Sequence, residues 1–449
     1  MTPLANIESK QNPWVNFLQT EWKLVRLKWT TYQVKNGIWG DEPLGSDDDI
    51  ICVRVADFDR TTFRVNLEGL TLRNIPYSQQ LGRVLKAGDL LIEKSGGGEL
   101  QPVGMVVIYS QHNTPAVCSN FIARVEVRKG HDPRFLTYLH AHLYLRRVNI
   151  RSIKQTTGIQ NLDSLSYFNE LVGIPPLEIQ KSIASFLDRK TTAINTLITK
   201  KQRLIQLLEE KRTGLINLAV TKGLNPNTPM KDSGISWIGE IPEHWEVIRL
   251  KFLMSYIVDC LHSTPTYDKE GRYPAIRTAD ISPGLLNIEG ANRVNDTDYI
   301  ERIQRLKPQV DDIIYSREGE RYGMAALVPP NVDLCLAQRV MMFRVNRQHS
   351  PKYIMWVLNA SCTYHQIKQY TVGATSPRVN IETIKEAWLP VPPKNEQIEI
   401  FDKIYDSFST ISKITHAIEK HIKKLQEYRQ SLITAAVTGK LNIGEEEDV

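Results

Sequence analysis

The sequence contains few cysteines and no long apolar run, and these absences exclude several classes of protein. Its five cysteines (Cys52, Cys118, Cys260, Cys335 and Cys362) include no CxxC pair, so neither a disulfide framework nor a zinc site is expected. The N-terminal residues MTPLANIESKQNPW lack the apolar segment of a signal peptide, and a run of about 18 apolar residues occurs nowhere. We therefore expect a cytoplasmic protein without membrane association.

An excess of positive charge is also lacking in the second half of the chain. The formal net charge is +6, but residues 236–390 contain 18 Lys or Arg against 18 Asp or Glu. Charge alone is therefore weak evidence for nucleic-acid binding, because solvated surfaces of mixed sign are common. Twelve of those 18 basic residues are arginines, however, and the planar guanidinium suits phosphates and guanine edges well. The composition modestly favours a nucleic-acid partner.

Motifs that would indicate methyl transfer or nucleotide binding are missing as well. A methyltransferase would need a glycine-rich cofactor loop and a D/N-P-P-Y/F motif, but the Pro-Pro pairs here follow Ile174, Val328 and Val391. The glycines at 96–98 are not followed by the GK of a phosphate-binding loop, so they indicate a flexible turn.

Nuclease and metal chemistry find no better support. Asp89, Glu93 and Lys94 might suggest a nuclease, but the matching residues of the second half are Asp312, Ser316 and Arg317, so the carboxylate pair is not kept. His140 and His142 have no other ligand types nearby and are interpreted as packing or surface residues. We predict no catalytic residue and no metal site.

An internal repeat organises the chain. GLINLAVTKGLN at 214–225 is nearly repeated as SLITAAVTGKLN at 431–442, with an offset of 217 residues. IPPLEIQKSI and VPPKNEQIEI, which begin at 174 and 391, match with the same offset, whereas WKLVRLK at 22–28 and WEVIRLK at 245–251 differ by 223. Such a repeat indicates two like structural units. The alternating residues after each tryptophan predict a strand.

Each repeat ends in a long helix with an apolar seam. Apolar residues recur there at alternating steps of four and three, the pattern of a helix that pairs with another helix. Pro175-Pro176 and Pro392-Pro393 suit the helix starts, and Gly223 and Gly439 suit the ends. The predicted seam comprises Ile183, Leu187, Ile194, Leu197, Leu204, Leu208, Leu215, Ile400, Ile404, Ile411, Ile414, Ile418, Leu425 and Leu432. Lys190, Lys201 and Lys211 interrupt it, and they either select the register or extend to water.

Two helices of this length imply a spacer between globular parts. Each would measure about 60 Å at a rise of 1.5 Å per residue. They could lie separately on their own domains, but seams this long usually pair with each other. Like units related by a twofold axis meet face to face, which makes their helices antiparallel. The predicted fold class is α+β: two globular α/β domains joined by two long antiparallel coiled-coil helices, with an internal pseudo-twofold repeat.

The order of these segments resembles the specificity (S) subunit of type I restriction-modification systems. A variable domain leads to a helix ending in AVTKGLN, and the linker PNTPMKDSGISWIGEIPEHWEV leads to a second variable domain and a helix ending in AAVTGKLN. The resemblance covers about Trp22 to Asn442. It implies an N-terminal tail (1–20), target recognition domain 1 (21–174), long helix 1 (175–222), a linker (223–244), target recognition domain 2 (245–391), long helix 2 (392–439) and an acidic tail (440–449).

The resemblance implies a non-catalytic subunit that reads double-stranded DNA. In this family each target recognition domain reads half of a split, asymmetric sequence, and the helices fix the gap between the halves. The helices also dock two modification subunits, which methylate an adenine in each half-site, and restriction subunits with motor and nuclease activity join them. S-adenosylmethionine, ATP and Mg²⁺ would therefore be bound by partner subunits, and this chain would bind no cofactor.

Phosphate contacts position a DNA-binding protein, and contacts to base edges specify the sequence. Suitable side chains are polar, chiefly Arg, Lys, Gln and Asn, in loops close to glycine or turn residues. The candidates are Arg54, Lys94, Ser119, Asn120, Lys154, Thr157, Gln160 and Asn161 in the first domain, and Arg277, Arg317, Arg321, Gln338, Arg339, Ser376 and Arg378 in the second. Any one of them could equally be an ordinary exposed residue or form a turn hydrogen bond. The sequence does not assign a base to any of them.

A coiled-coil adaptor that joins two protein ligands is the alternative function, since the same helices and divergent ends would serve it. The two functions differ in their response to salt, because counterion release weakens DNA binding steeply as salt rises. A self-contained enzyme is disfavoured by the missing motifs.

Overall fold

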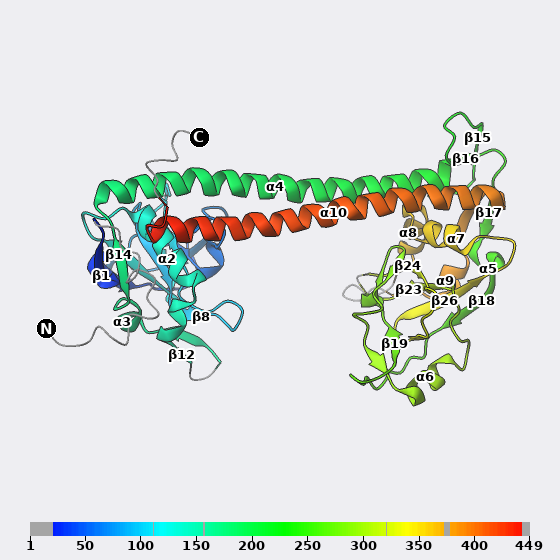
Figure 1. The fold of residues 1–449 in the computed structure, drawn as a ribbon, viewed down its shortest axis with the longest axis horizontal. Helices are drawn as coiled ribbons and strands as arrows, with labels where there is room; N and C mark the ends of the chain where they lie inside the picture. Colours follow the sequence, from blue (N-terminus) through cyan, green and yellow to red (C-terminus); the bar gives the residue numbers. More distant parts are fainter. Residues whose placement is uncertain (1–20, 111, 156–157, 320, 372–377, 442–449) are drawn as a thin grey trace. The chain divides into compact units, whose positions relative to one another are not determined.

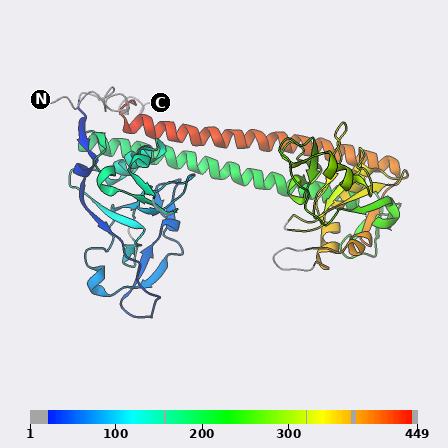
Figure 2. The same cartoon turned by 90° about the horizontal axis from the view of Figure 1, so that it is seen from below.

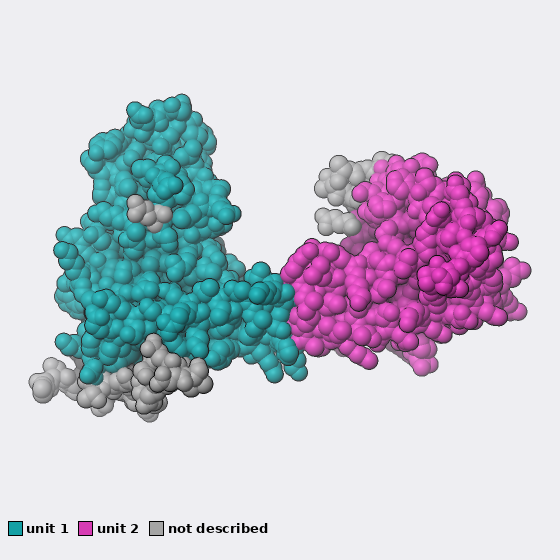
Figure 3. Space-filling view, turned by 90° about the horizontal axis from the view of Figure 1, so that it is seen from above, with its two compact units in different colours: residues 1–202, 419–449 teal, residues 203–418 magenta. Residues whose placement is uncertain are grey.

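The chain folds into two compact units that share its two long helices. The computed structural model describes residues 21–110, 112–155, 158–319, 321–371 and 378–441. The first unit consists of Met1–Gln202 and Glu419–Val449, and the second of Arg203–Ile418 (Figure 3). Helix α4 (Leu177–Lys222) begins in the first unit and ends in the second, whereas α10 (Lys394–Val437) begins in the second and ends in the first.

Proline and glycine residues delimit these helices. α4 starts directly after Pro175-Pro176 and α10 directly after Pro392-Pro393, where the missing proline N–H leaves no helical hydrogen bond unmade. Gly223 and Gly439 follow the two helix ends, each with a φ of 73°. This left-handed conformation terminates many helices, and glycine adopts it without a steric penalty.

In the first unit the start of α4 packs against the end of α10 (Figure 1). Ile194 and Ile198 of α4 share a hydrophobic core with Leu432 of α10. Arg429 of α10 is buried and donates a hydrogen bond to Asn195 Oδ1. The two helices therefore run in opposite directions in this unit.

In the second unit the arrangement is reversed, because the end of α4 packs against the start of α10 (Figure 2). Ile216 and Val220 share a core with Ile400, and the Arg212 guanidinium lies 4.9 Å from the ring centroid of Phe408. The predicted antiparallel helix pair is confirmed, and the alternative of two separately lying helices is wrong.

One of the two predicted seam rows is wrong by one residue in both helices. The row shared with the prediction is buried at Leu187, Ile194, Ile404, Ile411, Ile418 and Leu432, and half-buried at Leu208, Leu215 and Leu425. Ile183 and Ile400 begin the other predicted row near the helix starts, and both are buried. Further along the helices that other row faces water, since Leu197, Leu204 and Ile414 are 43%, 44% and 42% exposed. The residues that follow them lie inward, with Ile198 only 7% exposed.

The same shift applies to the polar residues of the predicted seam. Lys190 and Lys211 are exposed, whereas Thr191 is buried and lies 3.2 Å from the Tyr138 hydroxyl. Lys201 alone of the three lysines is half-buried. Two of the three lysines therefore lie outside the seam, so neither register selection nor extension from a buried position applies to them.

The first unit is a mixed α/β domain around a six-stranded sheet in the order β2-β11-β7-β9-β5-β4. A second sheet has the order β10-β3-β6, a third β12-β13-β8, and β1 pairs with β14. The strands are β1 (Lys23–Arg26), β2 (Thr31–Asn36), β3 (Asp49–Val53), β4 (Phe58–Asp59), β5 (Arg64–Val65), β6 (Thr71–Asn74), β7 (Leu90–Glu93), β8 (Ser95–Gly96), β9 (Val106–Ile108), β10 (Ala116–Cys118), β11 (Ile122–Val127), β12 (Ile153–Gln155), β13 (Gln160–Leu162) and β14 (Leu171–Ile174). The helices are η1 (Leu27–Thr30), η2 (Val55–Asp57), α1 (Tyr77–Gln80), α2 (Pro133–Leu145), η3 (Val148–Ser152) and α3 (Ser164–Tyr167).

The second unit repeats this plan with a four-stranded sheet, β18-β26-β23-β24, and a three-stranded sheet, β22-β19-β25. Smaller pairs are β15-β16, β17-β27 and β20-β21. The strands are β15 (Met230–Asp232), β16 (Glu240–Pro242), β17 (Glu246–Arg249), β18 (Met254–Asp259), β19 (Tyr273–Ile276), β20 (Ile281–Ser282), β21 (Leu285–Leu286), β22 (Arg293–Val294), β23 (Ile313–Ser316), β24 (Ala325–Leu327), β25 (Cys335–Leu336), β26 (Val340–Val345) and β27 (Trp388–Val391). The helices are α5 (Leu250–Leu253), η4 (Thr278–Asp280), α6 (Asp296–Ile303), α7 (Pro351–Leu358), α8 (Ser361–Lys368) and α9 (Ile381–Lys385).

The strand predicted after each tryptophan is confirmed and has the same partner in both units. Trp22 and Trp245 are buried, and the strands that follow them, β1 and β17, pair antiparallel with β14 and β27. Those partners are the strands that lead directly into the two Pro-Pro pairs. The predicted fold class is therefore confirmed.

A buried glutamine joins each long helix to its unit. Gln180 Oε1 accepts the Asp132 N–H at 2.9 Å, and Gln180 Nε2 donates to the Pro175 carbonyl at 2.9 Å. Gln397 makes the equivalent bonds with the Ser350 N–H at 2.8 Å and the Pro392 carbonyl at 2.9 Å. These bonds satisfy backbone groups that would otherwise be buried without a partner.

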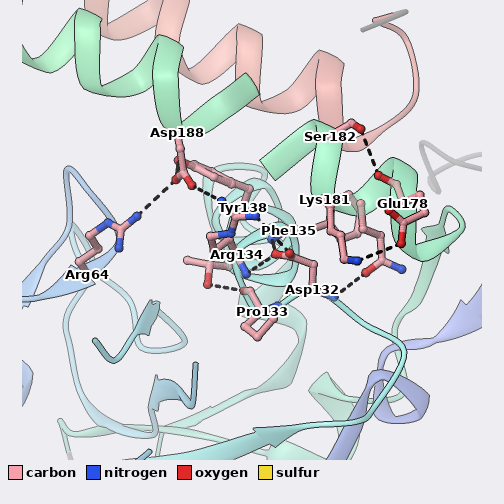
Figure 4. A network of polar contacts seen from close by, with 12 residues as sticks. Arg64, Asp132, Pro133, Arg134, Phe135, Tyr138, Glu178, Lys181, Ser182 and Asp188 are labelled. Carbon is pink, nitrogen blue, oxygen red and sulfur yellow. Dashed lines mark hydrogen bonds and ion pairs between the residues drawn. The ribbon is translucent and has the colours of Figure 1, made fainter. Parts of the chain in front are cut away.

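In the first unit Asp188 adds a polar network between α4 and the domain (Figure 4). Its carboxylate accepts hydrogen bonds from Arg134 at 3.0 Å, Tyr138 at 2.9 Å and Arg64 at 3.3 Å. Asp132 caps α2 by accepting the Arg134 N–H at 2.9 Å. The first turns of α4 are thus held on α2 by charged and polar contacts as well as apolar ones.

Among the described residues, none of the helices combines the length and the apolar character that a membrane span requires.

Candidate nucleic-acid interface

In the first unit a parallel strand pair brings two predicted DNA-binding loops together. Strands β3 and β10 are parallel, so their carboxyl ends meet at one edge of the sheet. Arg54 follows β3, and Ser119 and Asn120 follow β10. All three line a cavity of about 410 Å³, together with Gly96 and Gly97. The glycine segment is therefore part of the candidate site and not an isolated turn.

A β-hairpin extends this site. Strands β12 and β13 pair with each other, and β13 also pairs with β8. Lys154 forms an ion pair with Asp163 at 2.7 Å, and Asn161 Oδ1 accepts a hydrogen bond from the Ser95 hydroxyl at 2.6 Å. Gln160 is buried and its Oε1 accepts the Val103 N–H, so this side chain braces the hairpin from inside. Thr157 lies outside the described residues.

Three candidates of the first unit, Lys94, Ser119 and Asn120, differ in accessibility. Lys94 Nζ donates to Asn36 Oδ1 at 2.7 Å, and partial burial holds the pKa of Lys94 below its usual value. Ser119 is buried, whereas its neighbour Asn120 is exposed. Asn120 is thus the better placed of the two for a contact with a large ligand.

The second unit forms the corresponding site by the same topology. Strands β19 and β25 are parallel, which places Arg277 after β19 near Gln338 and Arg339 after β25. The Thr278 hydroxyl donates to the Arg339 carbonyl at 3.2 Å. Arg321 donates to the Ala279 carbonyl at 3.1 Å, so three of the predicted arginines surround one turn.

Two further candidates of the second unit, Arg317 and Arg378, line a neighbouring cavity of about 510 Å³ with Asp259 and Glu318. Arg317 is buried and paired with Asp259 at 3.2 Å and Glu318 at 3.0 Å. Such a side chain anchors the loop and is not presented to solvent. Ser376, the last candidate, lies outside the described residues.

Gln338 and Arg339 are held by local contacts. Gln338 Nε2 donates to the Thr264 hydroxyl at 2.7 Å. Arg339 has a φ of 64°, an uncommon left-handed value for a residue other than glycine. The Arg339 carbonyl accepts the Arg317 N–H at 3.1 Å, and this hydrogen bond helps to hold the backbone of Arg339 in the left-handed conformation.

Aromatic residues at these sites were not among the sequence-based candidates. Trp39 and Phe121 line the first cavity, and Phe121 is 43% exposed. In the second unit the Arg277 guanidinium lies 5.9 Å from the ring of Tyr267, which is partly exposed. The position of Phe121 directly after Asn120 was the available signal, because exposed aromatic rings can stack on nucleotides.

The acidic residues first considered for nuclease chemistry form structural ion pairs. Asp89 and Arg124 are both buried, and Arg124 Nε lies 2.6 Å from Asp89 Oδ2. The second unit repeats this ion pair, with Arg344 Nη2 at 2.7 Å from Asp312 Oδ2. Glu93 is buried beside Arg60, and burial raises the pKa of Glu93. Within the described part of the chain, no group of three His, Cys, Asp or Glu side chains is arranged to hold a metal ion.

Comparisons with known proteins agree with these features. The family model described as "Type I restriction modification DNA specificity domain" matches residues 79–208 and 242–424. The MjaVIII specificity subunit of a type I restriction enzyme from Methanocaldococcus jannaschii is 22% identical over 311 residues, which are 68% of this chain and 70% of that protein. The EcoBI specificity subunit from Escherichia coli is 21% identical over 339 residues, 73% of this chain and 70% of that protein.

Two solved structures share the fold. A chain from a study of complex assembly and conformational transition of the type I R-M system covers 94% of this chain and 99% of its own length, with a TM-score of 0.68 and 15% identity. The HsdS subunit from Thermoanaerobacter tengcongensis covers 94% and 98%, with a TM-score of 0.51 and 15% identity. The family model matches well over half of the chain and part of both units. The chain therefore belongs to the type I restriction modification DNA specificity family, as a specificity subunit.

Proposed function

We propose that this chain is the non-catalytic subunit that reads a split, asymmetric DNA target. The observation that carries the proposal is that the two units form the same cluster of loops from different amino acids. Lys94 and Arg317 both follow the central strand of their sheet, and each donates its N–H to the next loop, at the carbonyl of Phe121 or Arg339. The residues that accept these bonds, Phe121 and Arg339, are themselves unlike and expose their side chains, which suits two readers of unlike half-sites.

The long helices would act as the spacer and the docking surface. Leu197 of α4 and Ile414 of α10 occupy equivalent positions of the repeat, 217 residues apart, and both expose apolar surface. One such residue lies in each unit. A matched pair of apolar positions supports the docking of two copies of one partner, the modification subunit, and restriction subunits would join through it.

The chemistry of the complex would belong to these partners. Base methylation requires the target adenine to leave the duplex and enter a cofactor-bearing pocket. S-adenosylmethionine would be bound by the modification subunits, and ATP and Mg²⁺ by the restriction subunits. The role of this chain is to place that machinery at one sequence.

The test is an exchange of residues 30–160 for the corresponding segment of a relative, followed by mapping of methylated adenines in cells that carry the partner subunits. We expect one half of the methylated target to change while the other half and the gap stay the same. A parallel strain without this gene should lose the methylation altogether. An unchanged pattern after the exchange would show that this unit does not read DNA.

A further inference from the structure

One partly exposed motif keeps three of its four residues in the two units, although most of the loops around it differ. Arg54-Val55-Ala56-Asp57 and Arg277-Thr278-Ala279-Asp280 share the letters R-x-A-D, with the 223-residue offset that also relates Trp22 to Trp245. Each motif follows the strand of its unit that takes part in the parallel pair. The two arginines are therefore equivalent in sequence and in topology.

The geometry of the two motifs is also the same. In the first, the Arg54 N–H and Nε donate to Asp57 Oδ2 at 2.7 and 3.4 Å, and Nη2 donates to Oδ1 at 3.0 Å. In the second, Arg277 makes the three equivalent bonds to Asp280 at 2.9, 3.2 and 3.4 Å. The carboxylates are buried, whereas the arginine side chains are 40% and 36% exposed.

This arrangement holds a charged group ready at the surface. The hydrogen bond to aspartate raises the pKa of both arginines, so they stay cationic. Within the described residues, Nη1 of neither arginine forms a hydrogen bond. A guanidinium fixed through Nε and Nη2 loses little conformational entropy when Nη1 binds a ligand.

The presence of the same exposed residue in both units indicates a contact with phosphate and not with a base edge, for the following reason. The two half-sites of an asymmetric target present different base edges, so side chains that read bases should differ between the units. Asn120 and Gln338, which lie at equivalent places, do differ. Every half-site presents the same phosphates, however, and phosphate contacts position the protein without carrying sequence information.

We propose that Arg54 and Arg277 are the paired phosphate clamps of the two units, and that Asp57 and Asp280 are the residues that position them. This inference rests on the proposed DNA-reading function and assigns a role within it. The clamps set each unit on the duplex in the same way, so that the unlike loops beside them meet the bases.

The test uses the full chain assembled with its modification subunits. The probes are a duplex that carries the methylated target found in cells and a scrambled duplex of equal length. Dissociation constants are measured over a series of salt concentrations. Arg54→Ala and Arg277→Ala should each weaken binding to both duplexes by the same factor and lower the slope of log K against log salt by about 1, with about 2 for the double variant.

Control variants separate this role from others. Arg64→Ala removes an arginine of similar exposure that is paired with Asp188, and it should leave the slope unchanged. Arg54→Lys keeps the charge and should keep the slope. If Arg54→Ala misfolds, Arg54→Gln, which can still bond to Asp57, should give the same lowered slope.

Three results would overturn the inference. An unchanged slope with a lowered melting temperature would make Arg54 only a brace of its turn. A loss confined to the target duplex, with one base position relaxed in the methylation pattern, would make it a base reader. If the wild-type assembly bound neither duplex in a salt-dependent way, the proposed function itself would fail.

Discussion

At the scale of single residues, His140 is a titratable group that folding buries almost completely. It is 1% exposed on α2, and its Nδ1 lies 2.8 Å from the Tyr167 hydroxyl, with the two rings stacked. Burial lowers the pKa of His140 to about 3. This histidine is a packing residue, as the sequence suggested.

The low pKa of His140 predicts a loss of stability in mild acid. The unfolded chain binds the proton with a pKa of about 6.5, but the folded chain does not. The contribution of His140 is therefore complete above pH 6.5 and is lost as the pH falls toward 3, by about 1.4 kcal/mol per pH unit. Denaturant unfolding at pH 7, 6 and 5 checks this.

The variant His140→Phe supplies the comparison for that measurement. It is expected to be less stable at pH 7, because the Tyr167 hydroxyl loses its partner, but to lose less stability between pH 6 and 5. Parallel curves for the two proteins would show that His140 does not cause the acid sensitivity.

Residue types were easier to predict than their burial. Arg54, Arg277 and Arg317 were chosen by the same rule, as arginines near turns, yet the first two are partly exposed and Arg317 is buried against Asp259. The partner carboxylate lies 58 residues away in the chain. A contact at such a separation depends on the tertiary fold, so the sequence around Arg317 could not predict its burial.

At the scale of elements, the seam of α4 provides a sharp comparison between adjacent residues. Ile198→Glu would place an unpaired carboxylate in the core shared by the helices, so we expect a loss of more than about 3 kcal/mol in the free energy of unfolding. Leu197→Glu changes a solvent-facing position and should cost less than about 0.5 kcal/mol. Equal losses from both variants, measured by denaturant unfolding, would contradict the observed seam.

The same variants bear on docking. Leu197→Glu and Ile414→Glu should each reduce the amount of modification subunit that copurifies with the chain, because a charge would replace exposed apolar surface. Full recovery of two modification subunits with the double variant would place the docking surface elsewhere.

The period of the helices was predictable, but the choice of row was not. The seam needs a second row beside the buried row through Leu187 and Ile194, and that second row can lie three or four positions further along the helix. Both alternatives are apolar, because positions 197 and 204 hold leucine and positions 198 and 205 hold isoleucine. The choice is made by the domain beneath, where Tyr138 contacts Thr191. Lys190 beside Thr191 was the one local hint.

At the scale of the whole molecule, the proposed spacer predicts a coupling between helix length and target gap. Deleting residues 200–206 and 417–423 removes one heptad from each helix and keeps the buried row in phase. It shortens each helix by about 10 Å, which is about 3 base pairs of duplex at 34 Å per turn. We expect a methylated target with a shorter gap, or failure of assembly.

A deletion of five residues from each helix is the matched control. It rotates the following segment by about 140°, at 100° per residue, and turns the buried row toward water, so folding should be lost. Methylation with the original gap after the seven-residue deletion would contradict the spacer proposal.

The repeat made the fold predictable from a single sequence. Its constant offset of 217 along the helices follows from packing, since one inserted residue would rotate every later side chain out of the seam. The domains tolerate insertions in loops, so their offset drifts to 223 and their strands could be placed only at the tryptophan segments.

The path of the chain also determines when the first unit can fold during synthesis. Its core includes Leu432, Ile433, Ala436 and Val437, and the Thr434 hydroxyl lies 3.1 Å from His142 Nδ1. The ribosome therefore releases the N-terminal unit with part of its hydrophobic surface uncovered, and that surface waits while some 200 intervening residues are translated. Until α10 emerges, this uncovered surface is open to aggregation, so we expect chaperones or early partner binding to protect the nascent chain.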